Sequence, residues 1–253
     1  MAKKKRMKKG AKKFFGIIIG IIAIFLGCEI VEYQVLNKMD REPVEIHEKD
    51  YYVLRDFGYL EEKSDYDYNQ NGIDDYTDII NGAKKLAEIN PAYVSKYYAG
   101  GYPPLNEGVC TDVIWWALKE AGYLLKDMMA KDIREEYKTE HSAYDIPIID
   151  DNIDFRRVGN QEVFFKKYAE NLNPDIYDIG AFQRGDIITF NDSEHIAMIS
   201  DKRNAQGIPY LIQNSDEEQT EKEEDVLLET EMVVTGHYRF TYTEEIQALI
   251  DRM

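Results

Sequence analysis

Cys110 and His195 are the residues of this 253-residue chain whose settings suggest nucleophilic chemistry. Cys110 follows a Gly/Pro-rich loop and opens an apolar stretch with helical spacing, so its thiol is expected at a helix N-terminus. The positive end of the helix dipole favours a thiolate there and predicts a pKa below the ~8.5 of a free thiol. Alternatively, a lone cysteine on a helix is a small buried apolar residue.

His195 opens an apolar strand that directly follows another predicted strand. A histidine at the mouth of a strand can reach a helix N-terminus packed on the sheet, where it would act as a general base. Its second ring nitrogen then needs an orienting partner. The next predicted strand ends with two amides, Gln213 and Asn214, and either one can supply that partner.

A second pattern is that of a calcium-binding loop. From Asp67 to Asp78 the chain places oxygen-bearing side chains at positions 1, 3, 5, 9 and 12 and a glycine at position 6, which is the register of an EF-hand-type loop. A hard cation needs about six to eight oxygen ligands, and the glycine permits the sharp bend that turns alternate side chains inward. Alternatively, these residues form an Asx-rich turn that caps the following helix. The predicted ligands are Asp67, Asn69, Asn71, Asp75 and Asp78, with the carbonyl of Ile73.

The elements that must position these residues follow from apolar periodicity. Helical spacing is present over residues 76–88, 110–121 and 161–172, the last behind Asn160 as its cap, and a C-terminal helix is expected over 244–253. Strand patterns follow at residues 186–190, 195–200, 210–214 and 232–242. This order predicts an α+β fold in which N-terminal helices pack on a C-terminal antiparallel sheet.

Composition excludes several classes of function. The formal net charge is −17 although a cluster of basic residues precedes residue 14, so the remainder of the chain is more acidic still. Such a body repels phosphate backbones, and no nucleic-acid partner is expected. The chain has two cysteines, Cys28 and Cys110, which excludes a disulfide framework and a four-cysteine zinc site. The acidic interval 216–225 is expected to be a solvated hairpin loop, with cation binding as a minor alternative.

The N-terminus has the composition of a targeting segment. The basic cluster is followed by the uncharged apolar residues 14–26. Residues 1–28 are therefore expected to be an uncleaved signal anchor, a lipoprotein signal that is lipidated at Cys28, or a cleaved signal. Each interpretation exports the acidic body and leaves the basic cluster cytoplasmic. Residues 29–63 are charged and broken by Pro43, and we expect them to form a stalk.

Six ordered motifs resemble a known family. They are Tyr97-Tyr-Ala-Gly-Gly-Tyr-Pro-Pro, Gly108-Val-Cys-Thr-Asp-Val-Ile, Asn152-Ile-Asp-Phe-Arg-Arg-Val, Arg184-Gly-Asp-Ile-Ile-Thr-Phe, His195-Ile-Ala-Met-Ile-Ser-Asp-Lys-Arg and Thr235-Gly-His-Tyr-Arg-Phe. Together they resemble the bacterial family of domains of unknown function numbered 1287, which in turn resembles the NlpC-type cell-wall peptidases. The resemblance implies a papain-like α+β domain over residues 76–243. The patterns described above place the membrane segment, the stalk and a calcium-type loop over residues 64–78 ahead of it.

The resemblance also implies catalytic roles. Cys110 would attack an amide carbonyl, and His195 would take the thiol proton. Gln213 is the first choice as the residue that orients the imidazole, and Asn214 is the second. Tyr97 matches a tyrosine that the peptidases carry ahead of their cysteine, and its hydroxyl would bind the oxyanion together with the Cys110 N–H.

Three further residues are candidates for substrate binding. Asp112 lies in the first turn of the predicted helix and would either bind a substrate amine or cap the helix. Arg156 and Arg157 would either meet substrate carboxylates or form structural ion pairs. The leading hypothesis is an exported, membrane-tethered cysteine hydrolase of peptidoglycan peptides that holds structural calcium and uses no cofactor for catalysis. The alternatives are a calcium-stabilised, catalytically silent cell-surface binding module, and acyl transfer on the same fold.

Overall fold

The computed structural model describes residues 51–139, 142–229 and 231–253. The predicted targeting segment with Cys28, and most of the predicted stalk, lie outside these residues. Among the described residues no helix has the length and apolar character needed to cross a membrane. The chain from Asp50 to Met253 forms one compact unit.

The helices agree with the predicted pattern in the first half of the unit. The predicted helices at 76–88 and 110–121 are confirmed as α2 (Asp75–Ile89) and α3 (Cys110–Glu120). A further helix, α4 (Leu125–Glu136), was not predicted, because charged residues interrupt its apolar stripe. The expected C-terminal helix is α6 (Glu244–Ile250). Two short 3-10 helices complete the set, η1 (Leu54–Phe57) and η2 (Asp154–Arg156).

The third predicted helix is displaced toward the N-terminus. It is α5 (Val158–Tyr168), so Asn160 lies inside the helix and does not cap it. The Asn160 amide instead donates to the carbonyl of Asp154 at 2.9 Å. Ala169 turns to an extended conformation, and the following residues form β3 (Glu170–Asn171), which pairs with the last strand of the sheet.

An antiparallel sheet fills the second half of the unit and confirms the α+β class. Its strands are β3, β4 (Ile187–Phe190), β5 (His195–Arg203), β6 (Pro209–Ile212), β7 (Glu223–Glu224) and β8 (Val234–Arg239). Their order in space is β3-β8-β4-β5-β6-β7, and every neighbouring pair is antiparallel. The acidic interval 216–225 contains β7, so part of it belongs to the sheet and not to a loop. A separate parallel ribbon pairs β1 (Ala92–Tyr93) with β2 (Glu107–Gly108).

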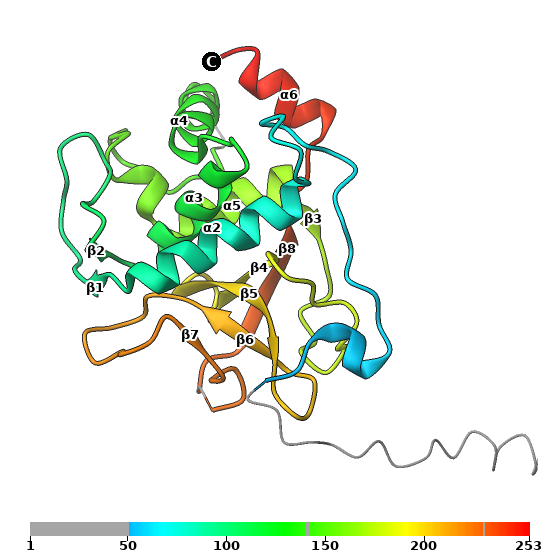
Figure 1. Ribbon diagram of the computed structural model, residues 1–253. Helices are drawn as coiled ribbons and strands as arrows, with labels where there is room; N and C mark the ends of the chain where they lie inside the picture. The colour runs from blue at the N-terminus through cyan, green and yellow to red at the C-terminus, as the bar shows by residue number, and fades with distance from the viewer. Residues whose placement is uncertain (1–50, 140–141, 230) are drawn as a thin grey trace, which may run out of the picture. The chain divides into compact units, whose positions relative to one another are not determined.

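Helices α2, α3 and α5 cover one face of the sheet (Figure 1). Successive strand residues point to opposite faces, so Ile196 and Met198 of β5 join the helical core while Ala197 and Ile199 join a second core on the other face. Gly82 lets α2 approach α3 closely, because a Cβ atom there would lie 2.8 Å from the Cβ of Glu120. The sheet and α2 therefore hold α3 from two sides.

The described part of the predicted stalk contacts the domain. Tyr52 forms a β-bridge with Arg203, and Leu54 is buried. Glu62 accepts an ion pair from Arg239 at 2.6 Å. Residues 51–62 therefore pack on the domain and do not form a free linker.

Candidate active site

Cys110 is the first residue of α3 and follows β2 after a single residue. That residue, Val109, is extended (φ −134°, ψ 179°). The carboxylate of Asp112 accepts the N–H of Val109 at 2.8 Å and closes the first turn of the helix. The predicted position of the thiol at a helix N-terminus is therefore confirmed, and its side chain is half-buried.

His195 begins β5, and Gln213 follows the end of the neighbouring strand β6. The antiparallel pairing of the two strands brings these side chains together, with Nε2 of His195 2.8 Å from Oε1 of Gln213. Because an amide oxygen only accepts, Nε2 carries the proton in this arrangement and Nδ1 keeps its lone pair. Gln213, the first choice for the orienting residue, thus contacts the imidazole. The contact holds the ring in the tautomer that a general base at Nδ1 requires.

The thiol meets the start of β5. The backbone N–H of Ile196, the residue after His195, lies close enough to the Cys110 sulfur to lower the pKa of the thiol, as do the N–H groups of Thr111 and Cys110 itself. Cys110 and Thr111 belong to the N-terminus of α3, and Ile196 belongs to the start of β5. The two elements that carry the predicted nucleophile and base therefore touch at the sulfur.

The charge state of the free site differs from the sequence expectation. Burial raises the pKa of the Cys110 thiol to about 11, and the three backbone N–H groups offset this only in part. Burial also lowers the pKa of His195, although the hydrogen bond to Gln213 and the charge of Asp216 raise it. At neutral pH the free site therefore holds a neutral thiol and a neutral imidazole. The helix dipole was expected to dominate, but desolvation of the thiolate outweighs it.

Tyr93 lies near the N-terminus of α3, and no sequence motif marks it. β1 pairs with β2 so that Tyr93 is opposite Gly108, two residues before Cys110. Burial, and after it the charge of Cys110, raises the pKa of the Tyr93 hydroxyl. Tyr97, the predicted oxyanion donor, is 55% exposed, and its hydroxyl accepts from the amide of Asn152 at 3.0 Å. No sequence pattern marks Tyr93, because its place depends on a strand pairing that spans a loop.

Asp112 has a structural role. Arg156 binds both of its carboxylate oxygens, through Nε at 2.8 Å and Nη2 at 2.7 Å. Trp115 donates its indole N–H to the same carboxylate at 2.7 Å. Asp112 and Arg156 are both buried, so the structure favours the helix cap and the structural ion pair over contacts with a substrate. Arg157 is exposed and lies 3.8 Å from Asp154.

Asn214 points away from the histidine. Its amide nitrogen donates to the carbonyl of Pro91 at 3.4 Å. Its oxygen is buried and has no hydrogen-bond partner among residues 51–139, 142–229 and 231–253. Asn214, the second choice for orienting His195, is therefore not in contact with the imidazole.

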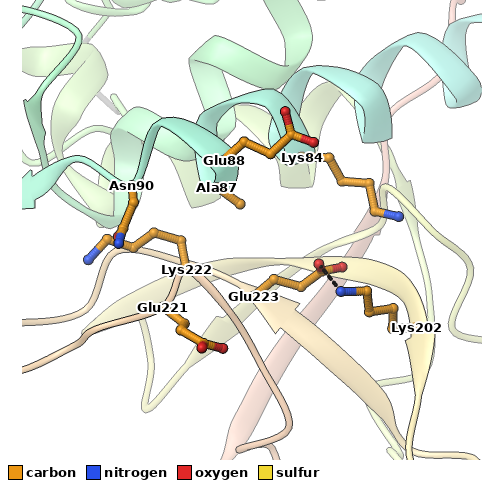
Figure 2. Close-up of a pocket in the computed structure, with 8 residues that line it drawn as sticks. All are labelled: Lys84, Ala87, Glu88, Asn90, Lys202, Glu221, Lys222 and Glu223. Atoms are coloured by element: carbon orange, nitrogen blue, oxygen red, sulfur yellow. Dashed lines mark ion pairs between the residues drawn. The ribbon is translucent and has the colours of Figure 1, made fainter. Parts of the chain in front are cut away.

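Two open cavities flank the β6–β7 end of the sheet. One, of about 420 Å³, adjoins Gln213 and is lined by Ser215, Asp216 and Gln219 among others. The other, of about 400 Å³, lies between α2 and β7 (Figure 2), and in it Lys202 pairs with Glu223 at 2.7 Å. The second cavity contains none of the predicted catalytic residues. The first is lined by Gln213 but by neither Cys110 nor His195.

The predicted calcium ligands form a closed polar loop before α2. Asp78 Oδ2 accepts the amide groups of Asn69 and Asn71, each at 2.8 Å. Asp67 accepts the backbone N–H of Asn71 at 3.0 Å and that of Gly72 at 2.8 Å. Four of the predicted ligands are thus gathered, while Ile73 donates its N–H back into the loop, to Asn71.

The fifth predicted side chain, Asp75, faces inward to the protein. It accepts the hydroxyl of Tyr123 at 2.6 Å and the N–H of Tyr68 at 2.8 Å. The cap of α2 is Asp74, which accepts from Thr77 at 3.3 Å. Among the described residues no group of three or more His, Cys, Asp or Glu side chains is arranged to hold a metal. Two of the four side chains gathered in the loop are asparagines and not carboxylates.

The site thus combines a cysteine at a helix N-terminus with a histidine and a glutamine that are in contact at the ends of neighbouring strands. The chain belongs to the family described as Domain of unknown function (DUF1287), whose model matches residues 80–240. It is 34% identical over 154 residues to the Uncharacterized protein YijF of Escherichia coli (strain K12), a match that covers 60% of this chain and 73% of that protein. No solved structure matches the chain.

Proposed function

We propose that this chain is a cysteine hydrolase of amide bonds. The observation that carries the proposal is the 2.8 Å contact between His195 Nε2 and Gln213 Oε1, next to a thiol that begins α3. A cysteine, a histidine and an amide in this order are the parts of a thiol hydrolase triad. The helix, the strands and this contact also support a papain-like, NlpC-like arrangement of the site.

The chemistry follows from the two neutral groups. As the Cys110 sulfur attacks the amide carbonyl, its proton passes to Nδ1 of His195, and a carbon–sulfur bond forms. His195 then gives that proton to the leaving amine, and the carbon–nitrogen bond breaks to leave a thioester. Water, deprotonated by His195, releases the acid and restores the thiol. Gln213 holds the imidazole in the required tautomer throughout.

The negative oxygen formed in the first step needs donors. The backbone N–H of Cys110 lies at the helix N-terminus, where the dipole favours negative charge. The hydroxyl of Tyr93 supplies the second donor, since β1 sets it across from the residues before Cys110. Tyr97 is not assigned this role, because its hydroxyl is hydrogen-bonded to Asn152.

The substrate class is peptide in the bacterial cell wall. This part of the proposal rests on the sequence of residues 1–28, whose basic and apolar halves predict export and a membrane tether. Peptidoglycan peptides are the nearest abundant amides outside such a membrane. The open cavity beside Gln213 leaves room for a peptide.

Digestion of purified cell wall tests the hydrolase. The full chain and its Cys110→Ala variant are incubated with cell wall, and the released fragments are identified by mass spectrometry. Fragments with a new amine and a new carboxylate are expected from the wild type alone. Equal release by both chains would remove Cys110 from the reaction.

A silent binding module on the same fold is the second candidate. The observation that favours it is the burial that raises the pKa of the Cys110 thiol to about 11, because a protonated thiol is a poor nucleophile. This candidate predicts that the chain binds cell-wall peptide and releases no fragment. Sedimentation with insoluble cell wall, compared between wild type and Cys110→Ala, measures that binding directly.

We also propose that the loop from Asp67 to Asp78 holds a structural calcium ion. The donor set fits a hard cation, because carboxylates and amide oxygens are the ligands that calcium prefers. Asp67, Asn69, Asn71 and Asp78 would hold the ion. In the structure Asn69 and Asn71 turn their amide N–H groups to Asp78, so both side chains would rotate to present their oxygens to the ion. The ion would neutralise the carboxylates of the loop and take no part in catalysis.

A further inference from the structure

Asn214 has an unsatisfied oxygen in a place where such atoms are rare. The residue is 1% exposed, and its Oδ1 has no hydrogen-bond partner within the described part of the chain. A buried amide oxygen without a donor costs free energy, so native proteins usually pair it. An unpaired acceptor at this depth therefore points to a donor that comes from outside the chain.

The same amide lines a small pocket on the flank of α3. Three prolines, two leucines and two tryptophans make up most of its wall, and Gly108 and Val109, the two residues before Cys110, complete it next to the thiol. The apolar wall consists of Leu86, Pro91, Pro103, Pro104, Leu105, Trp115 and Trp116. The residue before Asn214 is Gln213, which holds His195. The pocket thus adjoins the segments that carry both halves of the proposed site.

The charge and size of the pocket restrict what can enter. Two carboxylates line it and both are already paired, Asp112 with Arg156 and Glu107 with Lys96. A charged group would therefore lose its hydration without gaining a partner. The free volume is about 10 Å³, which is close to the ~10–15 Å³ that one water occupies by the same measure. The outer wall at Pro104 and Leu105 is exposed, so entry requires only that this segment move.

We infer that this pocket is a substrate subsite that binds a small uncharged residue, glycine or alanine, through one N–H donated to Asn214 Oδ1. The assignment to substrate rests on the proposed function, because it assumes that the bond to be cleaved lies over Cys110. Stiff proline rings limit the side chain to a methyl group. The donor satisfies the one polar atom of the pocket wall that the protein leaves unpaired among the described residues.

The two tryptophans of the chain report on binding directly, because both line the pocket. The full-length Cys110→Ala chain, labelled with ¹⁵N, is titrated with N-acetylalanine N′-methylamide, and the two indole N–H signals are followed by NMR. We expect both signals to shift with saturation at millimolar probe. N-acetyl-N-methylalanine dimethylamide, which has no N–H, and N-acetyllysine N′-methylamide are expected to cause no saturable shift.

Two variants separate recognition from folding. Asn214→Leu removes the acceptor and keeps the volume, so the alanine probe should no longer shift the indole of either tryptophan. Because this variant also loses the contact to Pro91, its melting temperature is measured alongside. Trp116→Ala enlarges the pocket, and the remaining Trp115 indole should then respond to N-acetylvaline N′-methylamide, which the unmodified pocket rejects. This second variant tests the pocket even if Asn214→Leu does not fold.

The outcomes distinguish the pocket from the hydrolase. No shift with any probe, or an equal shift with the probe that lacks N–H groups, would overturn the subsite and leave a buried water as the partner of Asn214. Since the titration uses a chain without the thiol, it stands whether or not cell wall is digested. If digestion fails while the indoles respond, the hydrolase proposal fails and the binding pocket survives.

Discussion

At its N-terminal end α3 carries Cys110. Backbone N–H groups of α3 and of β5, the strand that begins with His195, lie near its sulfur. At its C-terminal end the same helix is met by the polar loop that precedes α2. There Asn69 donates to the carbonyl of Glu120 at 2.8 Å, and Tyr123, just past the helix, donates to Asp75 at 2.6 Å. The polar groups at this end are paired within the protein.

We call the Cys110 end of α3 the reactive end, after its proposed role, and the Glu120 end the supporting end. A closed network of hydrogen bonds holds a helix in place, because each member lowers the cost of burying the next. At the N-terminal end, by contrast, His195 contacts Gln213 through Nε2, which leaves Nδ1 for the proposed reaction with the Cys110 thiol. The polar loop fixes α3 so that the thiol at the other end keeps its position. Changes at the two ends should therefore have different consequences, on chemistry at one and on stability at the other.

The largest expected effect is on catalysis. His195→Ala removes the general base and should lower kcat for cell-wall digestion by about 10²- to 10⁴-fold. Because His195 is buried and bonded to Gln213, the melting temperature of the variant is measured alongside. Gln206→Ala, in an exposed turn, is the control and should leave kcat unchanged. A loss of less than tenfold for His195→Ala would mean that the thiol end is not a Cys–His site.

Alkylation of the thiol by iodoacetamide sharpens the same point. Only the thiolate reacts, and the pKa of Cys110 is raised to about 11, so the labelling rate should rise about tenfold per pH unit from pH 6 to pH 10. An ordinary thiol would level off near pH ~9, one half unit above its pKa of ~8.5. Peptide mass spectrometry separates Cys110 from Cys28. A rate that is constant from pH 5 to pH 8 would instead show a thiolate–imidazolium pair and would contradict the effect of burial.

The buried ion pair at the reactive end should matter for stability. Asp112→Ala leaves the Arg156 guanidinium buried without its partner, which should lower the free energy of unfolding by about 3–5 kcal/mol. Arg157→Ala is the matched control, since it removes an exposed guanidinium whose contact with Asp154 spans 3.8 Å and is worth about 0–1 kcal/mol. Urea unfolding measures both. Similar losses for the two variants would show that the buried pair has no special role in seating the helix.

Calcium should act at the supporting end alone. Binding to the folded state stabilises it by about 2.7 kcal/mol when free calcium is a hundred times Kd, so chelation should lower the melting temperature. Asp78→Ala should abolish this dependence, whereas Asp145→Ala, an exposed aspartate outside the loop, should retain it. If millimolar calcium causes no shift in the melting temperature of the wild type, the loop is only a hydrogen-bonded turn with its helix cap at Asp74.

The sequence predicted the parts of the site that depend on local pattern. Helical spacing placed Cys110 at the start of α3, and a run of apolar residues placed His195 at the start of β5. The contact of His195 with Gln213 followed from the order of the strands. Burial could not be predicted, because the desolvation of the thiol depends on everything packed around it.

Contacts between residues far apart in the chain could not be predicted from the sequence either. Asp112 has the position of a helix cap, but its tie to Arg156 crosses from α3 to the 3-10 helix η2. Asn160 has the residue type of a cap but lies within α5, because the helix starts two residues earlier. Tyr93 sits in a strand of two residues that carries no periodicity of its own.

Tyr93 and Tyr97 offer the smallest and most selective test of the reactive end. Tyr93→Phe removes one donor to the developing oxyanion, and because its hydroxyl is half-exposed we expect the low end of the usual cost, about 1.5 kcal/mol, or about tenfold in kcat. Tyr97→Phe removes only a hydrogen bond with Asn152, so kcat should stay within about twofold. Both variants keep the ring and its packing, and fragment release from cell wall measures both. A tenfold loss for Tyr97→Phe with none for Tyr93→Phe would restore the assignment made from sequence. It would also mean that the segment around Tyr97 closes over the thiol when substrate binds.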